Sequence, residues 1–269
     1  NRTWQTDYTA WDQVKRITLD EAHASGNYAA WSQGRAHNEF VFANIHRLLR
    51  DAVEQQHPGA PVGGEGMRHT DTYVGGDIAL NSDMVSILHG HERPTQPEYI
   101  RCFAEPGAVT GHWVGSYFDR NHAEQKMRWQ PWYSLFIGLN SAWWWTVSED
   151  PRIGPAGLMP DLTPSPQFDW MAQEIREIKR GAGKLLLNSN RLHDAIAVHY
   201  SMASMRALYS HPNPTGEDRE HWSKARIYDR MGIVRSKVAW GYILEDLGLQ
   251  YVHLRQRDIE KGALINDGY

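Results

Sequence analysis

The sequence predicts an α/β fold in which short buried strands alternate with amphipathic helices. Two observations lead to this prediction: four short apolar segments in the first two thirds of the chain end in polar or aromatic residues, and helical periodicity separates them. Strands of a buried parallel sheet have this continuous apolar character. A complete (β/α)8 barrel takes about 250 residues, so four such units in about 180 residues predict the C-terminal half of one, over residues 1–183.

The four predicted strands and the helices between them follow in order. One helix has an apolar face formed by Val41, Ile45, Leu48, Leu49 and Ala52, because residues three or four apart share a helix face. The four strands cover residues 60–64, 83–88, 109–114 and 138–145.

A helix near residue 170 has the best-marked ends in the sequence. Ser165 is its predicted N-cap, Pro166 occupies its first position, and Gly181 stands just past its end.

Residues 184–269 predict the start of a second α/β unit, the N-terminal part of a doubly wound, flavodoxin-like domain. A strand over 194–201 is followed by a helix over 231–247 and a further strand over 251–254. Parallel strands need a crossover connection, and this helix supplies one. We therefore expect the two strands to be adjacent and parallel, in a sheet that the chain ends before completing.

Composition restricts the class of protein and its partners. The 269 residues are 22% charged and 41% hydrophobic, with a formal net charge of −4 and a pI near 6.4. This balance is normal for a soluble globular protein and predicts neither a nucleic-acid nor a membrane partner. Cys102 is the single cysteine, so no intrachain disulfide can form, which agrees with a cytoplasmic protein. The chain begins at Asn1 in mid-pattern, and we expect it to be a fragment.

Tryptophan is the most informative residue type in this sequence. Trp143, Trp144 and Trp145 are consecutive, among twelve tryptophans in all. An indole offers a flat apolar surface to the C–H face of a sugar, although most aromatic side chains pack in cores and that alternative stays open. Successive strand residues face opposite sides, so Trp143 and Trp145 should share one face and Trp144 the other. Trp145, nearest the carboxyl end of its strand, is the predicted floor of a sugar-binding cleft.

Two glutamates are candidate site residues. Glu105 precedes Trp113 by eight residues at the approach to the third strand, and retaining glycosidases use two carboxylates about 5 Å apart. The alternative is a solvated loop glutamate. Glu65 follows the first strand in a glycine-rich stretch, where it could bind a sugar hydroxyl or cap a turn.

The histidines leave several possibilities open. His89 and His91 could share a metal, but no third ligand follows by spacing and no His-Glu-x-x-His pattern is present, so we predict no metal. Hydroxyl binding or a surface loop is the preferred role of His89, and His112 beside Trp113 is equally open. The glycine-rich stretch at 62–66 lacks the Lys-Ser/Thr of a phosphate loop, so no nucleotide cofactor is expected.

Scattered segments of the chain resemble glycoside hydrolase family 42, the β-galactosidase-like enzymes. Asn1-Arg2-Thr3-Trp4-Gln5-Thr6 resembles the Leu-Asn-x-x-Trp-Gly-Thr segment that follows the fourth barrel strand of that family. Residues 57–62 resemble the entry to its fifth strand, and residues 131–145 resemble its seventh helix and eighth strand. Residues 185–201 and 244–249 resemble the opening of its flavodoxin-like trimerisation domain.

The resemblance implies a retaining, cofactor-free hydrolase of terminal β-galactosides or related glycosides, trimeric when intact. Glu105 would be its nucleophile, while Glu65, His89, Trp113 and Trp145 would bind the sugar. The family's acid/base glutamate precedes the Asn-x-x-Trp segment and so would lie upstream of this chain, which alone should not hydrolyse aryl galactosides. A non-catalytic carbohydrate-binding or scaffold protein on the same barrel is the alternative, since fold does not fix function.

Overall fold

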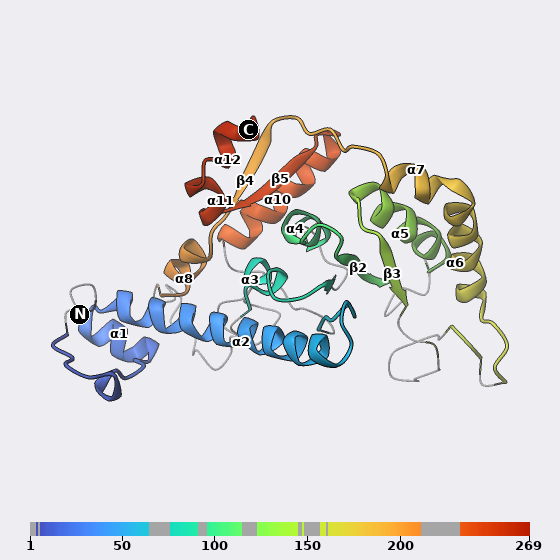
Figure 1. Ribbon diagram of the computed structural model, residues 1–269. Helices are drawn as coiled ribbons and strands as arrows, with labels where there is room; N and C mark the ends of the chain where they lie inside the picture. The colour runs from blue at the N-terminus through green and yellow to red at the C-terminus, as the bar shows by residue number, and fades with distance from the viewer. Residues whose placement is uncertain are drawn as a thin grey trace.

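The computed structural model describes residues 4, 6–64, 76–90, 96–114, 123–144, 147, 157–159, 161–210 and 232–269. Within them the protein has a mixed α/β architecture with two small parallel sheets, one of three strands and one of two (Figure 1). The predicted α/β class is therefore confirmed.

The three-stranded sheet has its strands in chain order. They are β1 (Ile87–Gly90), β2 (Val109–Val114) and β3 (Ser141–Trp144), all parallel. Helices α4 (Gln96–Phe103) and α5 (Ala123–Ile137) connect them, as parallel pairing requires.

Three of the four predicted strands differ from the observed ones. The fourth, over 138–145, begins only at Ser141 as β3. The second begins later than expected, at β1, because the amide of Met84 donates to the carbonyl of Asn81 and closes a turn there. The first, over 60–64, is reduced to a single parallel bridge between Gly63 and Ile87. The described strands thus form an open sheet of three, with this bridge at its edge.

Long and short helices precede this sheet. They are η1 (Trp11–Gln13), α1 (Leu19–Ser25), α2 (Tyr28–Gln56) and α3 (Ile78–Ser82). Helix α2 does not bury the face that its periodicity predicts: Ile45, Leu48 and Leu49 are 49–57% exposed. The residues of α2 that are buried are Ala30, Trp31, Glu39 and Ala43. The predicted helix is confirmed, but its apolar stripe is not the buried face, because the described neighbours of α2, chiefly α1, α3 and α8, pack against the other face.

The two-stranded sheet confirms the expected adjacent parallel strands. Strands β4 (Ile196–Tyr200) and β5 (Tyr251–Arg255) pair in register from Ile196 with Tyr251. The crossover includes α10 (Gly232–Asp246), close to the predicted helix. The other helices of this region are α8 (Met202–Ser210), α11 (Gln256–Glu260) and α12 (Ala263–Asn266).

Helix α6 (Pro166–Glu177) begins as its sequence predicts. The Ser165 hydroxyl accepts a hydrogen bond from the amide of Phe168 at 3.2 Å and caps the helix. The helix continues from α6 into a π-helical segment, η2 (Ile178–Ala182), within which Gly181 leaves the helical conformation. The predicted break at Gly181 is therefore confirmed, and it separates this helix from α7 (Gly183–Leu187).

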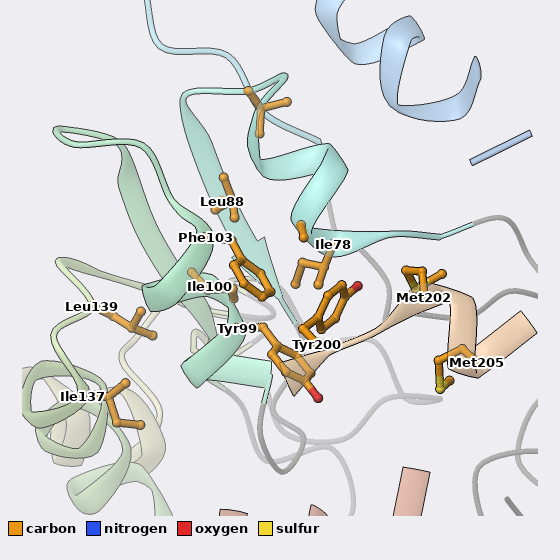
Figure 2. Close-up of a cluster of buried hydrophobic side chains, with 12 residues drawn as sticks. Ile78, Leu88, Tyr99, Ile100, Phe103, Ile137, Leu139, Tyr200, Met202 and Met205 are labelled. Atoms are coloured by element: carbon orange, nitrogen blue, oxygen red, sulfur yellow. The ribbon is translucent and has the colours of Figure 1, made fainter. Parts of the chain in front are cut away.

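One buried cluster includes residues from both sheets (Figure 2). Tyr200 of β4 packs edge-on against Tyr99 and Phe103 of α4, with ring centroids 5.3 and 4.9 Å apart. Helix α4 also contributes Ile100, which belongs to the same buried cluster as Leu88 of β1. Helix α4 therefore belongs to the cores of both sheets. The division into domains at residues 183 and 184 stays a prediction.

A buried carboxylate also joins the two sheets. Glu98 of α4 is 3% exposed and accepts hydrogen bonds from Arg101, whose guanidinium also donates to the carbonyl of Tyr251 at 2.7 Å. The Arg191 guanidinium lies 3.6 Å from the other oxygen of Glu98 and donates to the carbonyl of Phe136 at the end of α5. We call Glu98, Arg101 and Arg191 the Glu98 cluster. It connects α4, α5 and β5.

We predict that Glu98→Ala lowers the free energy of unfolding by about 3 kcal/mol or more, because two partly buried guanidinium groups lose their counter-charge. The matched control is Glu124→Ala: Glu124 is 54% exposed and pairs with Arg128, so its loss should cost about 0.5 kcal/mol or less. Urea denaturation of the three proteins measures both changes. Equal effects of the two substitutions would contradict a linking role for the Glu98 cluster.

A second buried carboxylate lies between α2 and α8. Glu39 is 2% exposed and accepts a hydrogen bond from Arg206 at 2.6 Å, while Arg206 also donates to Ser32. Burial raises the pKa of Glu39 to about 7; the nearby Asp77 carboxylate adds to the rise and Arg206 opposes it. Asp77 in turn accepts a hydrogen bond from the Tyr200 hydroxyl at 2.9 Å. The contact between α2 and α8 is therefore sensitive to protonation.

This arrangement predicts a pH-dependent stability. The folded protein binds the Glu39 proton more tightly than the unfolded chain, so the stabilisation is complete below pH 4.5 and is lost as the pH rises towards 7. Glu39→Gln should remove a decline of up to about 3 kcal/mol in the free energy of unfolding over this interval. Denaturation at a series of pH values, with the exposed Glu54→Gln as control, measures it. Parallel profiles for the wild type and Glu39→Gln would refute the prediction.

Candidate functional site

The two faces of the three-stranded sheet have different surroundings. Residues paired in a parallel sheet share a face, and side chains alternate along each strand. Leu88 and His112 face α4 and α5, since Leu88 packs with Ile100 and His112 contacts Ser134. The opposite face, which we call the aromatic face, carries His89 of β1, Gly111 and Trp113 of β2, and Ser141 and Trp143 of β3.

Three rings form a continuous layer on the aromatic face. The imidazole of His89 lies 4.3 Å from the indole of Trp113 and 5.0 Å from that of Trp143, measured between ring centroids. His89 is 4% exposed, whereas Trp143 is 36% exposed. The layer therefore contains one ring that is buried, the imidazole of His89, and one that is partly exposed to solvent, the indole of Trp143. The structure brings His89 and Trp113, two of the predicted sugar-binding residues, into contact, and the surface-loop alternative for His89 is wrong.

Trp143 was not among the predicted site residues, although the sequence contained the signal. Alternation along the strand places Trp143 and Trp144 on opposite faces, as predicted, and the register pairs Trp143 with Trp113. Trp145, the predicted floor of the cleft, lies outside the described residues, as does Glu65. Trp143 would have been identified as a site residue if its partner on β2 were known. The sequence does not give that partner, because strand register is a tertiary property.

Glu105 does not join the aromatic layer. It is exposed and precedes β2, and its carbonyl accepts a hydrogen bond from the amide of Ala108 in a turn. Trp113 is near the carboxyl end of the same strand, so the strand separates the two residues. Glu105 thus lies at the approach to β2, as the sequence indicated, and at the amino end of that strand, whereas the active-site residues of barrels lie at the carboxyl ends of the strands.

His112 has a structural position on the helix-covered face. It is 1% exposed, and its Nδ1 lies 3.2 Å from the Ser134 hydroxyl of α5. Burial lowers the pKa of His112 to about 4, with smaller contributions from His89 and Lys126, so the ring is neutral near pH 7. The open question about His112 is thus answered: it packs between sheet and helix.

The described residues contain no cluster of three or more histidine, cysteine or acidic side chains arranged to hold a metal ion. Among the helices in the described ranges, none is both long enough and apolar enough to cross a membrane. Comparison with protein-family models, with curated proteins and with solved structures finds no significant match. The geometry of the aromatic face is therefore the principal evidence on function.

The buried position of His112 predicts a loss of stability in acid. The unfolded chain binds a proton at this histidine near pH 6.5 and the folded protein only near pH 4, so stability should fall as the pH drops through this interval. The Glu39 contribution has the opposite slope, so the quantity to compare is the difference between profiles: relative to His112→Gln, the wild type should lose up to about 3 kcal/mol in the free energy of unfolding as the pH falls. The exposed His199→Gln is the control. A wild-type profile that matches His112→Gln would show that the ring titrates normally.

Proposed function

We propose that this protein binds a carbohydrate on the aromatic face, with the indole of Trp143 stacked against the sugar ring. The observation that supports the proposal is the layer of His89, Trp113 and Trp143, in which one indole is partly exposed. An indole combines a large apolar surface with one polar N–H group, which suits a ligand that has both C–H faces and hydroxyls.

The position of this layer also supports a binding role. Trp113 and Trp143 lie near the carboxyl ends of β2 and β3, and ligands of parallel α/β proteins bind outside the carboxyl ends of the strands. Both α4 and α5 pack on the opposite face. Helices on one face only are typical of a barrel wall, whereas a doubly wound sheet has them on both.

The finer fold assignments belong to the same proposal. We infer that residues 1–183 are half of a (β/α)8 barrel and that residues 184–269 begin a flavodoxin-like domain. The first inference is supported by strands in chain order with helices on one face, and the second by the parallel pair β4 and β5. A cytoplasmic location and a trimeric parent protein are proposals that rest on the single cysteine and on the family resemblance.

Retaining hydrolysis of β-galactosides is the second candidate function, and the resemblance to glycoside hydrolase family 42 favours it. The chemistry needs two carboxylates about 5 Å apart. Among the described residues of the aromatic face none is acidic, and Glu105 lies at the other end of β2. The two carboxylates that retaining hydrolysis needs would therefore have to come from other segments of the protein. Glu65 and Glu92 follow the first two predicted strands in sequence.

We predict opposite consequences for two neighbouring tryptophans. Trp143→Ala should weaken binding of methyl β-D-galactopyranoside about ten-fold, because the stacking surface is lost. Trp144→Ala should leave affinity unchanged and lower the free energy of unfolding by about 3 kcal/mol, since Trp144 lies on the helix-covered face. Calorimetric titration and urea denaturation separate the two effects. Weaker binding by Trp144→Ala, with unchanged binding by Trp143→Ala, would reverse the assignment of faces.

A further inference from the structure

The indole of Trp143 lies across the neighbouring strand. Trp143 belongs to β3 and contacts His89 of β1, and Gly111 of β2 stands between them. A Cβ atom added to Gly111 would lie 2.8 Å from Cδ1 of Trp143 and 2.7 Å from the carbonyl oxygen of Ser141. Carbon atoms of neighbouring groups pack at about 3.5–4.0 Å. The indole therefore occupies space that is open only because residue 111 is glycine.

Ser141 fixes the same edge of the indole. Its hydroxyl accepts a hydrogen bond from Nε1 of Trp143 at 2.8 Å and donates one to the carbonyl of Thr110 at 2.8 Å. Ser141 is two residues before Trp143 and shares its face. The hydroxyl thus links the indole N–H to the backbone of β2. Cδ1 and Nε1 are bonded neighbours in the pyrrole ring, so the space over Gly111 and the Ser141 hydroxyl act together on one edge of the indole.

We infer that Gly111 and Ser141 are positioning residues that hold the Trp143 indole flat over β2 as a preformed sugar platform. The inference rests on the proposed carbohydrate-binding function. An exposed tryptophan that could rotate would lose conformational entropy when a ligand stacks on it, and a ring fixed in advance avoids that cost. Gly111 leaves the space that the Trp143 ring occupies, and the hydrogen bond to Ser141 sets the orientation of that ring. Neither residue needs to touch the sugar.

The first experiment follows the indole N–H of Trp143 by nuclear magnetic resonance, assigned by the signal lost in Trp143→Phe. In Ser141→Ala its hydrogen exchange should be at least about five-fold faster, the equivalent of one lost hydrogen bond. Ser141→Thr keeps the hydroxyl and should restore slow exchange. Ser134→Ala, which removes a buried serine hydroxyl from the opposite face, is the matched control and should leave this signal unchanged.

The second experiment measures affinity for methyl β-D-galactopyranoside in the same proteins. Ser141→Ala should bind about five-fold more weakly and Ser141→Thr like the wild type. Gly111→Ala should lose binding because its methyl group would displace both the Ser141 hydroxyl, the atom nearest to it, and the Trp143 ring. Exchange in Ser141→Ala that matches the wild type overturns the inference, whatever the sugar does. If no wild-type binding is found but exchange accelerates in Ser141→Ala, the positioning stands and the proposed function fails.

Discussion

The structure depends on the Glu98 cluster and on the helix that carries it. A carboxylate that is 3% exposed is stable only with its counter-charges in place, and Arg101 and Arg191 supply them. Each arginine also donates to backbone carbonyls, one on β5 and one at the end of α5. Helix α4 is therefore held between the two sheets. Removing the carboxylate would leave two guanidinium groups in the contact that joins them.

The position of α4 determines which face of the first sheet is available. Helices α4 and α5 pack against Leu88 and His112. Because side chains alternate along a strand, the residues next to these two in their strands project from the other face of the sheet. That alternation brings His89, Trp113 and Trp143 into one layer. The space over Gly111 then lets Trp143 lie across β2. A packing requirement on one face thus creates the geometry of the proposed sugar platform on the other.

Local sequence signals predicted the parts of the fold that local interactions determine. The capping serine of α6, the limits of β2, and the parallel pair β4 and β5 agree with expectation. Predictions that needed tertiary knowledge were less successful. An apolar stripe on α2 indicates a face suited to burial but does not identify its neighbour, and the described structure buries another face. Glu105 was chosen by its spacing from Trp113, which does not specify the end of the strand. Strand register, which unites His89 with Trp143, is not encoded in either strand alone.

The most direct test of the proposed function uses protein labelled with nitrogen-15 at the tryptophan indoles. Methyl β-D-galactopyranoside is titrated in, and each indole N–H signal is followed after assignment by single substitutions. The account predicts saturable shifts for Trp143 and Trp113, which share the aromatic face, and none for Trp144, which faces the helices. Shifts confined to Trp144, or to exposed tryptophans of other elements such as Trp11 of η1 and Trp240 of α10, would contradict it.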